Sequence, residues 1–197
     1  MSNIVTLWDP GHGQYNGNQS PDGSVVEWSY CRELVALIVA GLREEGIEAH
    51  ILVPEIANIS LSERVRRVNA WCKKVGTQNV ALISVHLNAA GNGKVWRSAR
   101  GFLPFIDPNA GAGSKRLARY LYEEAEKNGL KGNRWISSNK YATKYLTMTH
   151  NTWCTAVLTE NLFQDNKDDV AILLSEEGKR KIVDTHVDAI RRWCNGK

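Results

Sequence analysis

Two histidines and two glutamates occupy positions from which they could act together on a metal ion. His12 lies in the glycine-flanked segment WDPGHG, and His86 and Glu160 each come directly after a short apolar run. Glu27 stands just before a stretch with helical periodicity. Imidazole nitrogens and carboxylate oxygens are common zinc ligands in hydrolases. The residue types therefore indicate a catalytic zinc site, provided that the fold brings the four side chains together.

Three of these residues follow segments that are typical of buried strands. The segments cover residues 4–8, 80–85 and 156–159, and each is short, mainly apolar and too brief for a helix. The carboxyl ends of parallel strands meet at one edge of a sheet, where the ligands of open α/β sheets collect. We therefore expect the residues that follow the three segments to converge at that edge.

The four side chains divide into three metal ligands and one base. A catalytic zinc ion keeps three protein ligands and leaves one position open for water. His12, Glu27 and His86 supply two neutral nitrogens and one carboxylate oxygen. A single Zn²⁺ ion held by them keeps a net positive charge and draws the pKa of bound water down towards ~7. Glu160 is then left to act as the general base, which takes a proton from that water and passes it to the departing amine.

Each assignment has a structural alternative. Either histidine could be satisfied by nearby backbone, and Glu160 could form a salt bridge at the end of its strand. Glu27 could merely cap the following helix, with Glu33 as a competing ligand. We favour Glu27 over Glu33 because Glu33 falls inside the helical pattern.

The remaining histidines and the loop tryptophans are interpreted as structural. His50 lies within a predicted strand, and His186 falls on the apolar stripe of the last predicted helix. His150 precedes Glu160 by ten residues and could approach the site, but this is not the favoured interpretation. Trp96 and Trp135 lie in predicted loops, where stacking on sugar or peptide is possible but ordinary packing is favoured.

Helical patterns alternate with the strand segments. Helices are predicted from Ser29 to Gly46, from Ser60 to Gly76, over 114–128 and after Ser175, with further strands over 47–53 and 101–106. Ser60 and Glu63 form a capping-box signature, and the second helix has an apolar stripe of Leu61, Val65, Val68, Cys72 and Val75. Pro104 moves the 101–106 strand towards the sheet edge.

Segment 131–149 shows no periodicity of helix or strand and could face the substrate. The order predicts an α/β three-layer sandwich, with a mostly parallel central sheet and helices on both faces.

Length and composition place the chain among ordinary globular proteins. The 197 residues suit a single catalytic domain, 1–197, with 43 % hydrophobic and 23 % charged residues. The net charge is +4 and the basic residues are scattered along the chain, which argues against nucleic-acid binding.

Four widely spaced cysteines indicate buried, reduced thiols. No run resembles a membrane span or a signal peptide, so we expect no membrane insertion, synthesis in the cytoplasm, and a monomer.

Five motifs in order resemble those of a known enzyme family. They are DPGHG at 9–13, Glu27, SLSERV at 60–65 with Asn69, SVHLNA at 84–89, and AVLTEN at 156–161. Together they resemble the zinc-dependent N-acetylmuramoyl-L-alanine amidases of the Amidase_3 type, from about Ile4 to the C-terminal helix.

The resemblance implies a fold, an activity and a set of site residues. It implies a central, mostly parallel sheet and hydrolysis of the amide between N-acetylmuramic acid and L-alanine in bacterial peptidoglycan. The family's zinc ligands fall on His12, Glu27 and His86, and its catalytic glutamate on Glu160. The chain departs from the family at Gln14 and in two stretches, 91–100 and 134–149, so the substrate-binding residues stay unassigned.

Two other functions and the route to the wall stay open at this point. The same site suits a zinc peptidase that cuts within the stem peptide, and the fold suits a non-catalytic wall-binding module. Without a signal peptide or a wall-binding module, the chain is expected to act on the wall after release, as a phage or prophage lysin does. The trimmed catalytic domain of an autolysin would look the same.

Overall fold

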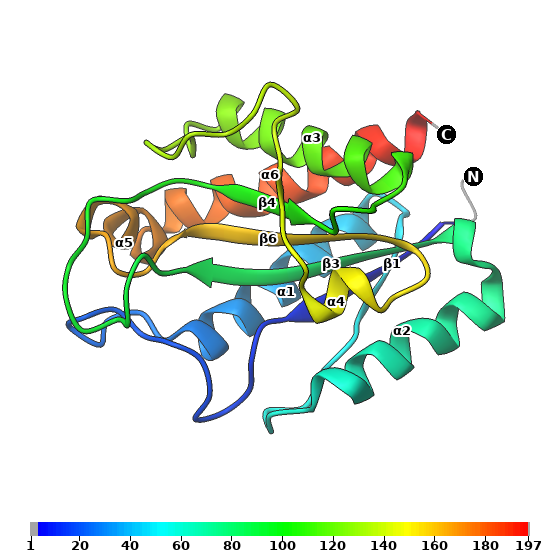
Figure 1. The fold of residues 1–197 in the computed structure, drawn as a ribbon, viewed down its shortest axis with the longest axis horizontal. Helices are drawn as coiled ribbons and strands as arrows, with labels where there is room; N and C mark the ends of the chain where they lie inside the picture. Colours follow the sequence, from blue (N-terminus) through cyan, green and yellow to red (C-terminus); the bar gives the residue numbers. More distant parts are fainter. Residues whose placement is uncertain (1–3, 197) are drawn as a thin grey trace.

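One six-stranded sheet organises the chain, for which the computed structural model describes residues 4–196 (Figure 1). The strand order is β2-β1-β3-β6-β4-β5, and every pairing is parallel except that of β4 with β6. The strands are β1 Val5–Pro10, β2 Glu48–Ile51, β3 Val80–Asn88, β4 Leu103–Ile106, β5 Ala142–Thr143 and β6 Thr155–Phe163. The carboxyl ends of β1, β3 and β6 therefore share one edge.

Helices cover both faces of this sheet. They are α1 Glu27–Glu44, α2 Leu61–Val75, α3 Ala112–Lys127, α4 Thr147–His150, α5 Lys167–Leu174 and α6 Glu176–Asn195, with a 3-10 turn, η1, at Thr77–Asn79. In Figure 1, α2 and α4 lie in front of the sheet, and α1 and α6 lie behind it. Helix α6 packs against α1, α3 and α5. The predicted three-layer α/β architecture is confirmed.

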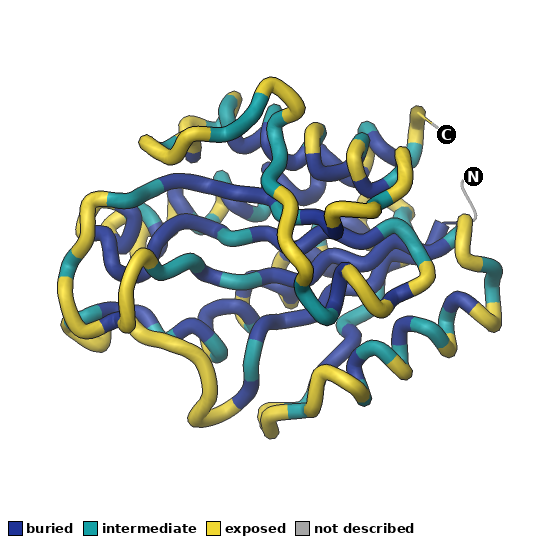
Figure 2. The backbone as a smooth tube through the Cα atoms, viewed as in Figure 1, coloured by how far each residue is buried: buried dark blue, intermediate teal, exposed yellow. Residues whose placement is uncertain are grey.

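Alternation along the strands gives each layer of helices its own core. Val5 and Leu7 of β1 join one apolar cluster with residues of α2, whereas Trp8 joins a second cluster with residues of α1, α3 and α6. Neighbouring side chains of a strand point to opposite faces, so one strand can fill both cores. The buried trace in Figure 2 accordingly runs through the sheet and the inner sides of the helices.

The helix ends mostly agree with the sequence pattern. The Ser60 hydroxyl accepts a hydrogen bond from Glu63 N (3.2 Å), and Gly76, with φ 90°, ends α2. Helix α1 begins at Glu27, two residues before the predicted start, so Glu27 is already helical. Leu61 is the first residue of α2 and is 52 % exposed, so the apolar stripe of this helix is buried only further along, at Val68 and Cys72.

Strand β4, which contains Pro104, lies one strand in from the sheet edge, in line with the expectation that Pro104 moves it towards the edge. Strand β4 pairs with β6 on one side and with the two-residue β5 on the other. Only Phe105 and Ile106 of β4 pair with β5, so Pro104, which lacks a backbone donor, lies outside that ladder. Strand β5 comes from segment 131–149, whose irregular sequence hid it.

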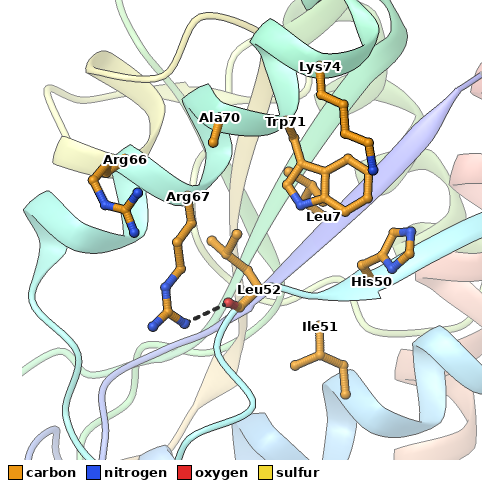
Figure 3. Close-up of a pocket in the computed structure, with 9 residues that line it drawn as sticks. All are labelled: Leu7, His50, Ile51, Leu52, Arg66, Arg67, Ala70, Trp71 and Lys74. Carbon is orange, nitrogen blue, oxygen red and sulfur yellow. Dashed lines mark hydrogen bonds between the residues drawn. The ribbon is translucent and has the colours of Figure 1, made fainter.

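A hollow of about 300 Å³ lies between α2 and β2 (Figure 3). Strand β2 is the edge strand opposite β5. Arg67 Nη1 donates to Leu52 O across it (3.1 Å). The rings of Trp71 and His50 lie 4.7 Å apart, and Lys74 Nζ lies 4.8 Å from the Trp71 ring. These polar groups are engaged in packing α2 on β2, and the hollow contains none of the four candidate site residues.

Two further predictions concern the cysteines and the membrane. Cys31 and Cys72 are buried, Cys154 and Cys194 are partly buried, and no disulfide joins them within residues 4–196. Across the described part of the chain, no helix has the length and apolar character that a bilayer span requires.

Candidate metal centre and active site

His12, Glu27 and His86 come together at the carboxyl ends of β1 and β3. One nitrogen or oxygen from each lies within 4.8 Å of the others. Glu27 Oε1 is 3.3 Å from His12 Nε2 and 3.2 Å from His86 Nδ1. The two imidazole rings stand nearly perpendicular, with centroids 5.0 Å apart. Two nitrogens and one oxygen thus face a common point, and this group could hold a metal ion.

The loop after β1 delivers His12 through a tight backbone path. Gly11 N donates to Val85 O of β3 (2.8 Å), so the loop starts bound to the neighbouring strand. A Cβ atom at Gly11 would lie 2.6 Å from His86 Nδ1, so only glycine lets the loop pass the second imidazole. His12 itself has φ 60°, a left-handed conformation that costs a non-glycine residue free energy.

A buried arginine holds this loop in place. Arg64 of α2 is 2 % exposed and donates to Asp9 Oδ1 (2.6 Å), to Pro10 O (2.6 Å) and to His12 O. The hydroxyl of Ser84 donates to the other oxygen of Asp9 (2.7 Å). Helix α2 and strand β3 are therefore both fastened to the segment that carries the first histidine.

Glu27 is buried at the first turn of α1 and is surrounded by donors. Its carboxylate accepts hydrogen bonds from Leu87 N and Asn18 N (both 3.2 Å) as well as facing the two histidines. Burial raises the pKa of Glu27, but the hydrogen bonds from His12 and His86 outweigh it and hold the pKa well below its ordinary value. The carboxylate is thus kept ionised, as a metal ligand must be.

Glu160 lies beside this group on the central strand β6. It is the register partner of His86, at the point where the β3–β6 pairing shifts. Such irregularities re-aim side chains next to active sites. Its Oε2 is shielded from solvent and has no hydrogen-bond partner. Burial, reinforced by the charge of Glu27 and opposed by His86, raises the pKa of Glu160 to about 7.

Comparison with known proteins identifies the family. Residues 7–192 match the Amidase_3 family, described as N-acetylmuramoyl-L-alanine amidase. The chain belongs to this family. It is accordingly an enzyme of the amidase type that hydrolyses peptidoglycan, which confirms the predicted family and activity.

Individual relatives agree with this membership. The chain is 28 % identical over 202 residues to the endolysin of Bacillus phage SPP1, covering all of the chain and 68 % of the endolysin. It is 26 % identical over 188 residues to the N-acetylmuramoyl-L-alanine amidase CwlM of Bacillus licheniformis, covering 95 % of the chain and 67 % of CwlM. The fold is similar to that of the amidase Ami1 from Mycobacterium smegmatis, with a TM-score of 0.85, 18 % identity and 98 % of both chains covered.

A groove of about 540 Å³ opens from the amidase's histidine pair. Residues 58–61, at the start of α2, and residues 145–148, around the start of α4, line this groove together with His12 and His86. Tyr145 is 64 % exposed at this groove, and its ring meets that of His150 edge-on at 5.3 Å. Part of segment 131–149, which has no periodicity, thus lines the groove beside the candidate metal centre.

The other candidate residues lie elsewhere. Glu33 pairs with Lys179 (2.6 Å) and does not join the metal group, so Glu27 is the carboxylate that accompanies the histidines. His50 pairs with Glu48 (2.9 Å). His186 is fully buried on α6 and contacts Ile182 O, consistent with a structural role.

His150 and the two loop tryptophans also stand apart from the metal group. His150 Nδ1 lies 2.6 Å from Asp107 Oδ2. Trp135 is 87 % exposed, and Trp96 is partly buried against the core.

Sequence reasoning missed several residues that shape the site. Arg64 lies inside the SLSERV motif, but its residue type alone does not predict a contact with the loop of His12. Asn18 contributes only a backbone N–H, which no side-chain pattern can reveal. Gln164 donates to Glu27, and the one sequence hint was its position four residues after Glu160.

Proposed function

We propose that His12, Glu27 and His86 hold one Zn²⁺ ion and that Glu160 is the general base for hydrolysis of the amide between N-acetylmuramic acid and L-alanine. The observation that carries this proposal is the partnerless, solvent-shielded oxygen of Glu160 beside the three-residue group. A buried carboxylate without a partner is costly, which makes it a candidate for chemistry rather than for stability.

The three candidate ligands fit zinc in type and spacing. Bond lengths of about 2.0–2.1 Å give edges of about 3.3 Å in a tetrahedral site. The distances from Glu27 Oε1 to His12 Nε2 and to His86 Nδ1 are 3.3 and 3.2 Å. One carboxylate and two imidazoles are also a ligand set that catalytic zinc sites use, with one position left open.

Glu160 and Glu27 have different roles in the proposed hydrolysis. When bound, zinc supplies a Lewis acid that polarises the scissile carbonyl and makes water acidic. Glu160 accepts the proton of the attacking water and returns it to the nitrogen of the departing L-alanine. Its pKa of about 7 suits both transfers, because the carboxylate can take up and release a proton near neutral pH. Glu27 is suited to be a metal ligand rather than a base, because its carboxylate stays ionised.

The groove between residues 58–61 and 145–148 is proposed to receive the muramyl peptide. Its lining mixes apolar walls, including Leu61 and Met148, with polar groups such as Asn58 and Thr147. A mixed lining of this kind suits a peptide joined to a sugar, which carries methyl groups, amides and hydroxyls.

Analysis of the end groups released from purified peptidoglycan tests the proposed reaction. The expected result is new amino groups on L-alanine with no new reducing sugars. Release of other amino groups would indicate a peptidase that cuts within the stem peptide, and release of nothing by a folded, zinc-loaded sample would indicate a wall-binding module. Either outcome would overturn the proposal.

The site of action follows from the same proposal. The relative from Bacillus phage SPP1 is named an endolysin. We infer that this chain likewise acts on the bacterial wall after release from the cell that makes it. Addition of the purified protein to bacterial walls from outside should therefore lower their turbidity, and intact turbidity over hours would contradict the inference.

A further inference from the structure

The two oxygens of the Glu27 carboxylate have different surroundings. Oε1 faces the two imidazoles and accepts a bond from Leu87 N (3.2 Å). Oε2 accepts bonds from Asn18 N (3.2 Å) and from the Gln164 side-chain amide, Nε2 (3.2 Å). Two donors therefore engage the oxygen that is turned away from the histidines.

Gln164 is the side chain among these donors. Asn18 and Leu87 contribute backbone N–H groups, which are fixed by the loop and by β3. Gln164 is fully buried, and its own backbone N donates to Asn88 O (2.9 Å), which anchors it just after β6. It follows Leu162, whose φ of 71° turns the chain near the end of that strand.

The other end of the Gln164 amide has no partner. Its Oε1 is buried and accepts no hydrogen bond. Leaving a buried acceptor unpaired costs about 1–3 kcal/mol. An apolar side chain of similar size would avoid this cost, so the contact that distinguishes glutamine here is the one to Glu27.

We propose that Gln164 is a positioning residue that holds Oε2 of Glu27 and thereby presents Oε1 alone to the metal. This inference rests on the proposed metal site. Without the amide, the carboxylate can rotate about its terminal bond, which changes the oxygen that faces the histidines. Groups that orient metal ligands from outside typically change metal affinity or activity by 10–100-fold when they are mutated.

Zinc affinity of the metal-free protein gives a test that does not depend on catalysis. The protein is stripped with a chelator and titrated with Zn²⁺ against a chromophoric competitor. Gln164→Met keeps the length of the side chain and removes the donor, so the zinc Kd should rise about 10–100-fold. Gln164→Glu keeps the shape and sets a second carboxylate against Glu27. Its effect on apo-protein zinc affinity should be at least as large.

A matched control separates positioning from general destabilisation. Thr185 is also fully buried and hydrogen-bonded, on α6, with contacts to Lys181 O and Asn128. Thr185→Val should leave the zinc Kd at the parent value, even where it lowers the melting temperature as much as the Gln164 variants do.

The outcomes distinguish this inference from the proposed function. A parent protein that binds no zinc would overturn the metal site, and the role of Gln164 with it. A parent that binds zinc, with an unchanged Kd in Gln164→Met or in Gln164→Glu, would overturn the positioning role alone. If the methionine variant fails to fold, the isosteric glutamate variant decides the question.

Discussion

Two glutamates near the same pair of histidines have opposite protonation behaviour. Hydrogen bonds from His12 and His86 overcome the effect of burial and hold the pKa of Glu27 low. Burial dominates at Glu160 and raises its pKa to about 7. Neighbouring carboxylates whose environments separate their pKa values typically serve as different participants in one reaction. Here the ionised group suits a ligand and the titratable group suits a base.

Glu160→Gln should retain zinc and lose at least ~10²-fold in the rate of peptidoglycan hydrolysis. The amide preserves the shape of the side chain but cannot take up the proton of water. Zinc content by metal analysis, together with the rate of L-alanine end-group release, measures both parts. Parent-level activity would remove Glu160 from the mechanism.

His86→Ala should fail to retain zinc through gel filtration, because the remaining His12 and Glu27 are two ligands rather than three. His150→Ala is the control, since His150 pairs with Asp107 outside the metal group. That variant should keep one zinc per chain. Stoichiometric zinc in His86→Ala would contradict the ligand assignment.

At the residue scale, sequence motifs pointed to the three side chains that the fold groups together, but not to the residues that support them. Glu27 begins α1, His12 follows β1, and His86 and Glu160 lie near the carboxyl ends of β3 and β6, where spacing and residue type are informative. Gln164 and Arg64 act through contacts that join segments far apart in the chain. A single sequence carries no signal for such contacts, because they depend on how the elements pack.

Helix α2 stabilises the loop of the first histidine through one buried ion pair. Arg64→Met should lower the free energy of unfolding by about 3–5 kcal/mol, because it leaves Asp9 buried without its cation. Urea denaturation measures the loss. Arg66→Met is the control on the same helix: Arg66 is exposed and pairs with Glu63 on the surface, so its removal should cost at most about 1 kcal/mol. Equal losses of unfolding free energy in Arg64→Met and Arg66→Met would argue against a stabilising role of the buried ion pair between Arg64 and Asp9.

The irregular segment before α4 contributes the exposed ring at the groove. Tyr145→Ala should raise KM for soluble muramyl peptide about 3–10-fold with little change in kcat, because the ring offers contact area at the groove and is not one of the candidate metal ligands. Trp135→Ala, which removes a more exposed ring of the same segment that does not line the groove, should leave KM unchanged. An unchanged KM in Tyr145→Ala would exclude the ring from substrate binding.

At the element scale, periodicity predicted the main strands and helices, and it failed where pairing is short. Ser60 and Gly76 bounded α2 correctly because caps are local signals. The partner of β4 could not be predicted, since β5 has two residues and no alternation. Pro104 indicated the neighbourhood of the edge, and the two-residue β5 adds one short strand outside β4.

The centre of the molecule contains a buried histidine whose charge would oppose folding. His186 is fully buried, contacts Thr159 Oγ1 (3.1 Å) and meets the rings of Trp8 and Phe102 edge-on. Burial lowers its pKa from 6.5 to about 4. The folded state thus binds this proton less readily than the unfolded state, and the associated stability is present above pH 6.5 and lost as the pH falls towards 4.

Between pH 7 and pH 5 this one group should cost the protein about 2 kcal/mol of unfolding free energy. Urea denaturation of the parent and of His186→Gln at the two pH values isolates the effect, because other titrating groups are common to both proteins. The loss between pH 7 and pH 5 should be smaller in the variant. The same loss in both would mean that His186 does not control acid stability.

The order of the candidate site residues along the chain has a consequence for synthesis. His12, Glu27 and His86 all precede Glu160, and Glu160 lies on β6, which is placed between β3 and β4. The ribosome therefore translates every candidate ligand well before Glu160. On the proposed assignment of Glu160 as the base, a nascent chain halted before β6 could not hydrolyse a cell wall.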